Sequence, residues 1–483
     1  MSFKPAARRP AGTRILGFVA SLIIYGALFA SFLSIDARPA SALPITAARV
    51  YAIPAYARKY DMPCSACHDS WPRLSPFGQA FKDNGYQLMN DRDAPIYQNP
   101  SYWPISFRIT PEWHRVSTNR VAVDGSTPGS TTEGQVTQHG FDWSGLDILA
   151  EGTLAKNISF IVLPSSDSTG AFHIEAVFVR FDNLLKSPWL NVKVGKFELD
   201  NLESEKRILT LSDLGGAYQN YHFQPVGETT YSFGIGDNQV GLEWMGHSKN
   251  DRTRISAALL TSTDGSPGLT SNNGGGIASG GTLTGKTYDG YFTASQAFQI
   301  GGLGLQRVGG FAYIGQAPTY PQYTSAGTAI DGTGIGNKSF YRAGFNGFFF
   351  FKKFDVTTMY FYGKDSAYLG TNTRSIDPLP TGAQSPTWNG ALIEPHYTVN
   401  PRLILTARYE AIRMSKQALA SNPSNLGNID AGTAGFRFYP FMSSRAGFAF
   451  HGEYSLVRQR GTAPVSGLDL TSSSLFAGFD FAF

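Results

Sequence analysis

The sequence has only two cysteines in 483 residues, and both lie in one short motif, so a disulfide framework is excluded. Charged residues make up only 16%, which is low for a large soluble enzyme. The net charge is +4 and no block of Lys and Arg stands out, so nucleic-acid binding is not indicated. What the chain does have is 53 Gly, 35 Phe and 23 Tyr, a composition typical of a β-rich protein with much non-aqueous or pore-lining surface.

The N-terminus has the layout of a targeting segment. A positive stretch (Lys4, Arg8, Arg9, Arg14) precedes an apolar run at 15–33, and Ala40-Ser41-Ala42 then offers a small-x-small cleavage site. We therefore predict a cleaved signal peptide at 1–42. The apolar run is also long enough to span a bilayer, so a retained helical anchor is the alternative.

The rest of the chain changes character near residue 100. Residues 43–100 hold the two cysteines and several prolines, and 77–88 reads as a short helix or turn that packs aromatic side chains. From 101 to 483, stretches of about ten residues alternate apolar and polar side chains between Gly, Asn, Asp, Ser and Pro clusters. The two cysteines stand in the pentapeptide Cys64-Ser65-Ala66-Cys67-His68, which has the Cys-x-x-Cys-His pattern of haem attachment. We therefore predict a small haem segment at 43–100 and a porin-like transmembrane barrel at 101–483.

Individual strands can be read directly. Ala155-Lys156-Asn157 predicts a tight turn into a strand at 158–163, and 176–181 is expected to pair with 190–197. Further predicted strands lie at 348–351, 354–356, 403–411 and 435–440. No apolar helix of about 20 residues follows the signal, so a spanning structure must be a closed barrel in which every backbone group is paired.

Counting segments from Ile105 to Phe483 predicts about sixteen strands, an even number, as bacterial barrels require. The fold class is therefore all-β: an outer-membrane antiparallel β-barrel preceded by a small cytochrome c-like segment. Residues 200–228 are too long for a turn and are predicted to form a large loop. The Gly/Ser/Thr-rich stretches 264–285 and 319–338 are predicted extracellular loops, with the short turns facing the periplasm.

The last residues resemble the terminal-strand signal of bacterial outer-membrane barrels. Apolar side chains alternate with smaller or more polar ones and end on a terminal Phe (Leu475, Ala477, Phe479, Phe481, Phe483). The ordinary alternative is the last strand of a soluble sandwich. Together with the signal peptide, the pattern predicts the outer membrane as the location.

The motif Cys64-Ser65-Ala66-Cys67-His68 carries the chemistry. Two thiols at this spacing can add to the two vinyl groups of one haem, and the adjacent His68 then reaches the iron as proximal ligand. A zinc site would need further Cys or a close second His, and a thioredoxin-type pair would need a βαβ context; the sequence shows neither. One covalent haem c is therefore the predicted cofactor.

The second axial ligand is less defined. Met89 follows His68 by twenty-one residues. A thioether opposite the imidazole would raise the haem potential. The alternatives are that Met89 is a core residue and that His114, or no protein side chain, takes the sixth position. Met62 is too close to Cys64 to fold back easily.

These features resemble one family. Beyond the pentapeptide, the stretches Trp71-Pro72-Arg73-Leu74, Phe77-Gly78-Gln79-Ala80-Phe81-Lys82 and Gly85-Tyr86 are similar to outer-membrane monohaem cytochrome–porin fusions of iron-oxidising bacteria. The resemblance covers the whole chain in architecture but is residue-specific only here. It implies an oxidoreductase that takes electrons from extracellular Fe(II) and passes them to a periplasmic blue-copper protein or soluble cytochrome c.

Two other classes remain open from the sequence. One is a solute-conducting porin whose haem segment is a plug or sensor. The other is a haem enzyme of the peroxidase type, which needs an open sixth position and a distal His or Arg. For iron binding, Glu203 and Glu205 are acidic candidates, although a solvated loop charge is the more ordinary role for each.

Overall fold

The computed structural model describes residues 55–60, 62–70, 73–88, 104–166, 169–199, 239–261, 288–319, 336–364, 387–414, 428–442, 447–460 and 470–482. The chain divides into two compact units, Met1–Val50 and Tyr51–Phe483, and every described residue belongs to the second. The predicted signal peptide at 1–42 lies outside the described residues. So do Met89, Trp71, Glu203, Glu205, the predicted loops 200–228 and 264–285, and residues 320–335 of the third.

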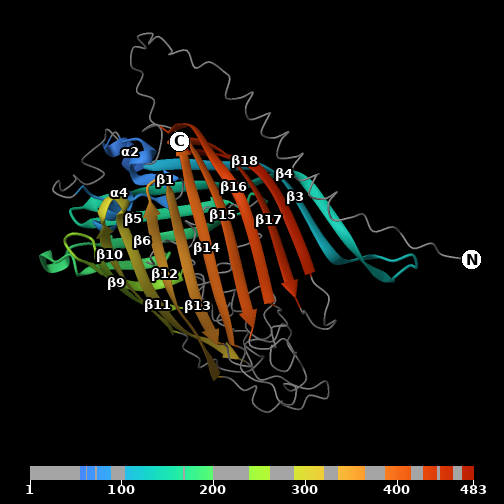
Figure 1. Cartoon of the computed structure of the whole chain (residues 1–483). Coiled ribbons are helices and arrows are strands. Elements are labelled where there is room, and N and C mark those ends of the chain that lie inside the picture. The colour runs from blue at the N-terminus through green and yellow to red at the C-terminus, as the bar shows by residue number, and fades with distance from the viewer. Residues whose placement is uncertain are drawn as a thin grey trace, which may run out of the picture. The chain divides into compact units, whose positions relative to one another are not determined.

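Sixteen of the described strands, β3 to β18, form a closed antiparallel barrel in which β18 pairs with β3 (Figure 1). This confirms the predicted all-β class, the antiparallel barrel and the count of about sixteen strands, while the cytochrome c-like nature of the preceding segment stays a prediction. The strands are β3 (Ile105–Asp124), β4 (Thr131–Ala155), β5 (Ile158–Ser166), β6 (Phe172–Phe181), β7 (Asn191–Phe197), β8 (Gln239–His247), β9 (Thr253–Thr261), β10 (Tyr288–Ile300), β11 (Gly304–Thr319), β12 (Gly336–Phe351), β13 (Phe354–Lys364), β14 (Thr387–Asn400), β15 (Leu403–Met414), β16 (Asn428–Met442), β17 (Gly447–Arg460) and β18 (Leu470–Ala482).

Short and long connections alternate around the barrel. The turn at Lys156-Asn157 joins β4 to β5, and Lys352-Lys353 joins β12 to β13. Asn157 and Lys352 have φ of 65° and 64°, the left-handed conformation that such tight hairpins need. We call the end with these turns the turn end and the opposite end the loop end. β3 begins and β18 finishes at the turn end, which faces the periplasm in bacterial barrels.

The outer face of the barrel is apolar. In β13, Tyr360 is 50% exposed while its neighbours Met359 and Phe361 are buried, and a similar alternation runs through much of β10 and β14. Phe441, Phe448 and Phe479 stack near the turn end, as an aromatic girdle at a membrane interface would. A closed barrel with this outer surface is of the outer-membrane, membrane-spanning type.

Two kinds of side chain are buried along the described strands of the barrel. Towards the loop end, buried aromatic and aliphatic side chains pack together, among them Tyr313, Phe340, Phe361 and Trp388. Towards the turn end, charged side chains are buried and paired with one another across strands. His396 bonds both Asp355 (2.7 Å) and Glu394 (2.6 Å), for example. Among the described residues, no helix is long and apolar enough to cross a membrane.

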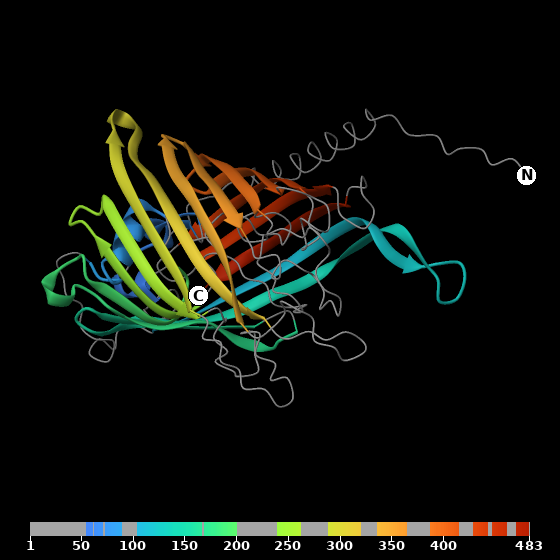
Figure 2. The same cartoon turned by 90° about the horizontal axis from the view of Figure 1, so that it is seen from below.

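The segment before the barrel contains α2 (Ala55–Tyr60), α3 (Cys64–Cys67), β1 (His68–Ser70), β2 (Arg73–Leu74) and α4 (Pro76–Asp83). The predicted helix or turn at 77–88 is confirmed: α4 ends at Asp83, and Gly85 then turns the chain with φ of 73°. Both views draw these helices in blue at one end of the barrel (Figures 1 and 2). Arg58 Nη2 donates to the carbonyl of Ile105 (2.6 Å), where β3 begins, so this is the turn end.

Candidate functional site

The haem motif forms its own short helix. Cys64 begins α3 and Cys67 ends it, and His68 begins the two-stranded β1–β2 ribbon. Ser75 fastens α4 to this helix, because its N–H donates to Cys67 O (2.8 Å) and its hydroxyl donates to Ala66 O (3.1 Å). The same hydroxyl accepts from Gly78 N (3.0 Å) and so caps α4. The helices α3 and α4, eight residues apart in the sequence, are thereby held together at the motif.

Gly78 explains why α4 can lie so close. A Cβ at this position would stand 2.0 Å from the carbonyl oxygen of Cys67, well inside van der Waals contact. Any side chain here would push α4 away from the motif. Gly78 is one of the residues that carried the sequence resemblance, and the close helix approach is its physical role.

An aromatic core supports the motif from behind. Tyr56 stacks on Tyr86 with ring centres 5.1 Å apart, and Phe81 meets Tyr56 and Tyr60 edge-on at 5.4 and 5.6 Å. Each such pair adds about 0.5–1.5 kcal/mol beyond area burial. These contacts, all between residues of the segment, give it a hydrophobic core of its own in addition to its contacts with the barrel.

A cavity of about 390 Å³ opens between the segment and the lumen wall. This size falls within the range of about 300–1,000 Å³ that is usual for ligand sites. Cys67 and His68 both line it. Aromatic and apolar side chains of the segment form one wall, and charged lumen side chains form the other (Tyr56, Tyr60, Met62, Leu74, Phe77, Phe81, Tyr86; Arg108, Asp147, Glu151, Arg180, Lys193, Arg437).

The structure places only some of the sequence-predicted haem ligands at the cavity. Cys67 and His68 come together at the cavity, the backbone of Cys64 lies one helical turn away in α3, and Met89 lies outside the described residues. Met62, which sequence spacing had argued against, is on the cavity wall. His114 is not among the lining residues. It lies six residues beyond Arg108 on β3, about 20 Å along the strand.

Cys67 differs from the nucleophile of a reactive dithiol. Burial raises the pKa of the Cys67 thiol, whereas thioredoxin-type nucleophiles need a lowered thiol pKa. Cys67 is half-buried and carries a free thiol. The local context is a four-residue helix followed by a small ribbon. The raised thiol pKa and this local context do not match a thioredoxin-type redox pair.

Arg180 on β6 is the main link between the segment and the barrel. Its guanidinium is buried and donates to Asp182 (2.7 Å) and to the carbonyls of Lys82 and Asp83 (2.6 Å each). It also lies 5.8 Å from the centre of the Tyr86 ring. One barrel arginine thus satisfies the last carbonyls of α4, which no helical N–H can reach.

A second link joins the end of α4 to the β8–β9 turn. Arg254 pairs with Asp83 (2.7 Å) and with Asp251. Burial raises the pKa of Asp83, and the Arg254 charge offsets this only in part. Burial also acts to raise the pKa of Asp251, but hydrogen bonding and charge from Arg254 outweigh it, so the pKa of Asp251 is lowered.

These two opposite shifts set a pH window. The pKa of Asp83 is higher in the folded protein than in the unfolded chain. The contribution of Asp83 to the stability of docking is therefore complete below the unfolded pKa of about 4, and it is lost as pH rises through the folded pKa. A lowered folded-state pKa means that the Asp251 contribution is complete above about pH 4 and is lost as pH falls through the folded pKa. For these two carboxyl groups taken alone, both contributions are therefore complete near pH 4.

Asp480 on β18 organises the charges on the far wall of the cavity. It accepts from Arg108 (2.8 Å) and Arg437 (3.0 Å), which both line the cavity, and its Oδ2 lies 3.5 Å from Nδ1 of His451. Arg108 also pairs with Asp147 (3.0 Å). Sequence analysis missed these residues. Their one available signal was a charged residue on the lumen-facing side of a predicted strand, and that pattern is common to all polar lumens.

Comparison with known proteins finds similar solved structures but no matching sequence. No family model and no curated protein sequence matches the chain. Among solved structures, it is similar to the outer membrane channel DcaP of Acinetobacter baumannii at 11% identity and a TM-score of 0.45, covering 78% of this chain and 97% of that one. It is similar to the anion-selective porin from Comamonas acidovorans (11%, 0.45, 78% and 98%) and to OprB of Pseudomonas putida (8%, 0.44, 78% and 94%). The assignment of this chain as a sixteen-stranded, outer-membrane type of barrel rests on its own strand pairing.

Proposed function

We propose that this protein is an outer-membrane electron carrier of the ferrous-iron-oxidising cytochrome type. A haem c attached through Cys64 and Cys67 accepts electrons from extracellular Fe(II) and passes them to a periplasmic cupredoxin or soluble cytochrome c. The observation that carries this proposal is that the haem-motif segment is docked at the turn end of the barrel, with Cys67 and His68 on a cavity of about 390 Å³.

The residues around the cavity fit the group. Bound haem supplies one-electron redox chemistry, since its iron alternates between the ferric and ferrous states. Cys64 and Cys67 would hold it covalently and His68 would ligate the iron. Met89, predicted from spacing, and Met62, on the cavity wall, are the candidates for a further protein ligand. Aromatic side chains form one wall of the cavity, and Lys193 and Arg437, paired with Glu243 and Asp480, lie on the other.

Buried side chains along the described barrel support electron transfer. Arg342, Glu243, Glu394 and Arg408 are each at most 4% exposed, and a buried aromatic cluster lies towards the loop end. An electron can pass through such packed side chains without an open channel.

The turn-end location supports the proposed direction of transfer. The short turns of bacterial barrels face the periplasm, so the cavity would lie within reach of a periplasmic acceptor. The electron donor would then reach the cavity from the loop side through the lumen. Fe(III), which precipitates readily, would form outside the cell or within the lumen.

The test is the reduction of the purified, haem-loaded protein by Fe(II). Under anaerobic, acidic conditions, Fe(II) should convert the oxidised haem spectrum to the reduced one, and a periplasmic-type cupredoxin should reoxidise it. Reduction by dithionite serves as the control for competent haem. A protein that dithionite reduces but Fe(II) does not, over a range of pH, would exclude the proposal.

A solute-conducting porin with a haem-bearing plug is the second candidate, and the barrel architecture itself favours it. Single-channel conductance in planar bilayers separates the two. A closed wild-type channel that opens when the docking contact of Arg180 is removed would show a plug. Steady ion conductance by the wild type, with haem that Fe(II) does not reduce, would favour the porin.

A further inference from the structure

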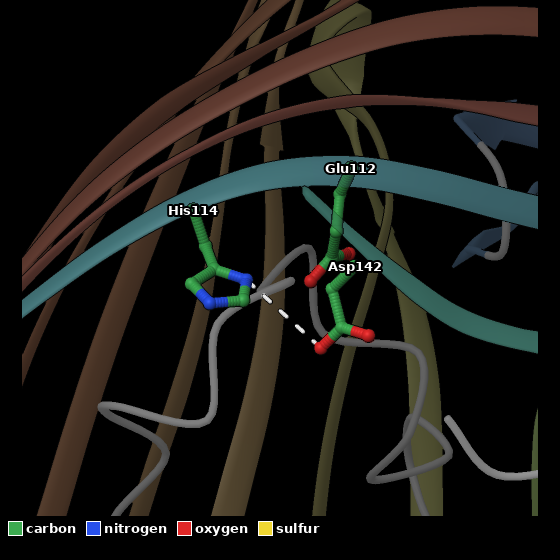
Figure 3. A group of neighbouring side chains, drawn as sticks. All are labelled: Glu112, His114 and Asp142. Atoms are coloured by element: carbon green, nitrogen blue, oxygen red, sulfur yellow. Dashed lines mark ion pairs between the residues drawn. The ribbon is translucent and has the colours of Figure 1, made fainter. Parts of the chain in front are cut away.

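Within the described part of the chain, one group of His, Asp and Glu side chains is placed to hold a metal ion, and it lies outside the haem cavity. Its members are Glu112 and His114 on β3 and Asp142 on β4. Figure 3 shows the three side chains pointing to the same side of the two strands and towards one another. Their ligand atoms all lie within 4.8 Å of each other.

Strand geometry brings these residues together. Glu112 and His114 are two residues apart, so they share a face of β3, and Asp142 pairs directly with Glu112 across the β3–β4 ladder. Arg108, which lines the cavity, lies on the same face of β3, so that face is the lumen face. The cluster begins four residues beyond Arg108, about 13 Å along the strand towards the loop end.

The side chains are oriented as metal ligands would be. Oδ1 of Asp142 accepts from the N–H of Trp143 (2.7 Å), and Oδ2 faces Nδ1 of His114 at 3.9 Å. A first-row transition ion with bonds of about 2.0–2.2 Å needs only a small rotation of these side chains. The side chains of His114 and Asp142 are 30% and 39% exposed, so an ion in the lumen can reach them.

A second observation points to the same place. His451 pairs with Gly478, and Gly478 pairs with Glu112, so the three lie in a row across β17, β18 and β3. A Cβ on Gly478 would stand 2.8 Å from Nε2 of His451 and 2.9 Å from Cβ of Glu112. The missing side chain thus leaves the His451 ring facing Glu112. The His451 side chain is 2% exposed, and within the described residues its Nε2 has no hydrogen-bond partner.

His451 also connects the cluster to the haem cavity. Its Nδ1 lies 3.5 Å from Asp480, and Asp480 binds Arg108 and Arg437 on the cavity wall. The His451 ring stacks on Phe476, which pairs with His114. A continuous set of contacts therefore runs from the cluster to the cavity along the lumen wall.

We infer that Glu112, His114 and Asp142 form a binding site for a divalent first-row transition ion, and that Fe(II) is the ion it takes during turnover. One imidazole and two carboxylates suit Fe(II) and Mn(II), and they leave positions open for water or exchange. The role of Fe(II) rests on the proposed function. One electron leaves the bound Fe(II), which becomes Fe(III), and the haem iron gains that electron on passing from ferric to ferrous.

Binding is measured first, on the haem-loaded protein with Mn(II) as the probe. Equilibrium dialysis with metal analysis counts bound Mn(II) without interference from haem iron. The variants are Glu112→Gln, His114→Ala and Asp142→Asn. The matched control is His139→Ala, because His139 is an exposed histidine of β4 that pairs with Arg115 and so faces away from the cluster.

The expected result is one bound Mn(II) in the wild type and in His139→Ala. The affinity of each cluster variant for Mn(II) should fall by at least about 10–100-fold, because the loss of even an outer-shell partner of a metal site costs this much. The binding of a variant is compared with the wild type only if dithionite gives it the wild-type reduced spectrum, which shows that it is folded. If His114→Ala does not fold, Asp142→Asn at a half-exposed position provides the second variant. Equal binding by all proteins, or by none, would overturn the inference.

Fe(II)-driven reduction of haem then tests the role of the site. The cluster variants should reduce more slowly than the wild type and His139→Ala at low Fe(II), while dithionite reduces all of them equally. Unchanged Fe(II) kinetics in variants that no longer bind Mn(II) would overturn the Fe(II) role. A wild type that binds Mn(II) but is not reduced by Fe(II) would support the metal site and reject the proposed function.

Discussion

Replacing Arg180 by methionine should release the haem-motif segment from the barrel. The substitution removes the guanidinium that binds Asp182 (2.7 Å) and the carbonyls of Lys82 and Asp83 (2.6 Å each). Methionine keeps much of the side-chain volume. The main loss is therefore of charge and hydrogen bonds, and Asp182, which is 1% exposed, keeps a buried charge without its cation.

The size of the effect follows from this burial. Removing one partner of a buried ion pair costs about 3–5 kcal/mol. At about 1.4 kcal/mol per factor of ten, the docked state should lose a hundredfold to several thousandfold in population relative to the undocked state. The double variant Arg180→Met/Asp182→Asn should lose less, because it leaves no uncompensated carboxylate behind.

Limited trypsin digestion measures the undocked population. Lys59 lies in α2 and its Nζ donates to Thr153 of the barrel wall (3.1 Å), so cleavage there requires the segment to open. When opening is fast relative to cleavage, the initial rate follows the open fraction. The rate should rise steeply in Arg180→Met and less in the double variant, while the barrel itself stays resistant.

Two results would refute this reasoning. A wild-type cleavage rate in Arg180→Met would mean that the guanidinium does not hold the segment. A faster rate in the double variant than in the single one would mean that the stranded Asp182 charge is not the cause.

Four further predictions concern the haem, the docking contacts and the location. Haem should remain on the protein in a denaturing gel and stain for peroxidase activity at the mature mass, and Cys64→Ala should weaken or abolish the stain. Met89→Ala should lower the haem potential markedly if Met89 is an axial ligand; if it is a core residue, a loss of stability of about 2–5 kcal/mol with unchanged potential is expected instead. Protease resistance of the segment should peak near pH 4, with Asp83→Asn removing the loss above this pH and Asp251→Asn removing the loss below it. N-terminal sequencing of the protein from the outer-membrane fraction should start near Leu43.

Each of these has a decisive contrary result. A colourless band from cells able to mature cytochromes c would reject the haem. An unchanged potential in Met89→Ala, together with a changed one in Met62→Ala, would move the second ligand to the cavity wall. A protease profile that is flat from pH 3 to pH 7 would reject the buried carboxylate argument, and an intact Met1 start in the inner membrane would reject export and cleavage.

The sequence alone determined the barrel and its strands. Side chains along a β-strand alternate between its two faces with a period of two. The strands at 158–163, 176–181 and 403–411 could therefore be recognised without knowing their partners. The connections join neighbouring strands, and pairing β6 with β7 needs only a short link between 181 and 191. Closure follows because membrane-spanning strands cannot leave an unpaired edge. The pentapeptide Cys64–His68 was also readable, because it consists of five consecutive residues, and its role in haem attachment stays a prediction.

Only the tertiary structure decided where these local features meet. The contact of Arg180 with α4 joins residues 97 and 98 positions apart, and Asp480 joins Arg108 across 372 positions. The row from His451 over Gly478 to Glu112 depends on the register of three strands, which no single strand pattern specifies. Periodicity places each side chain on the lumen face, but the registers around the closed barrel decide which lumen side chains touch. That is why the cavity wall, the docking contacts and the metal-ligand cluster appeared only in the folded molecule.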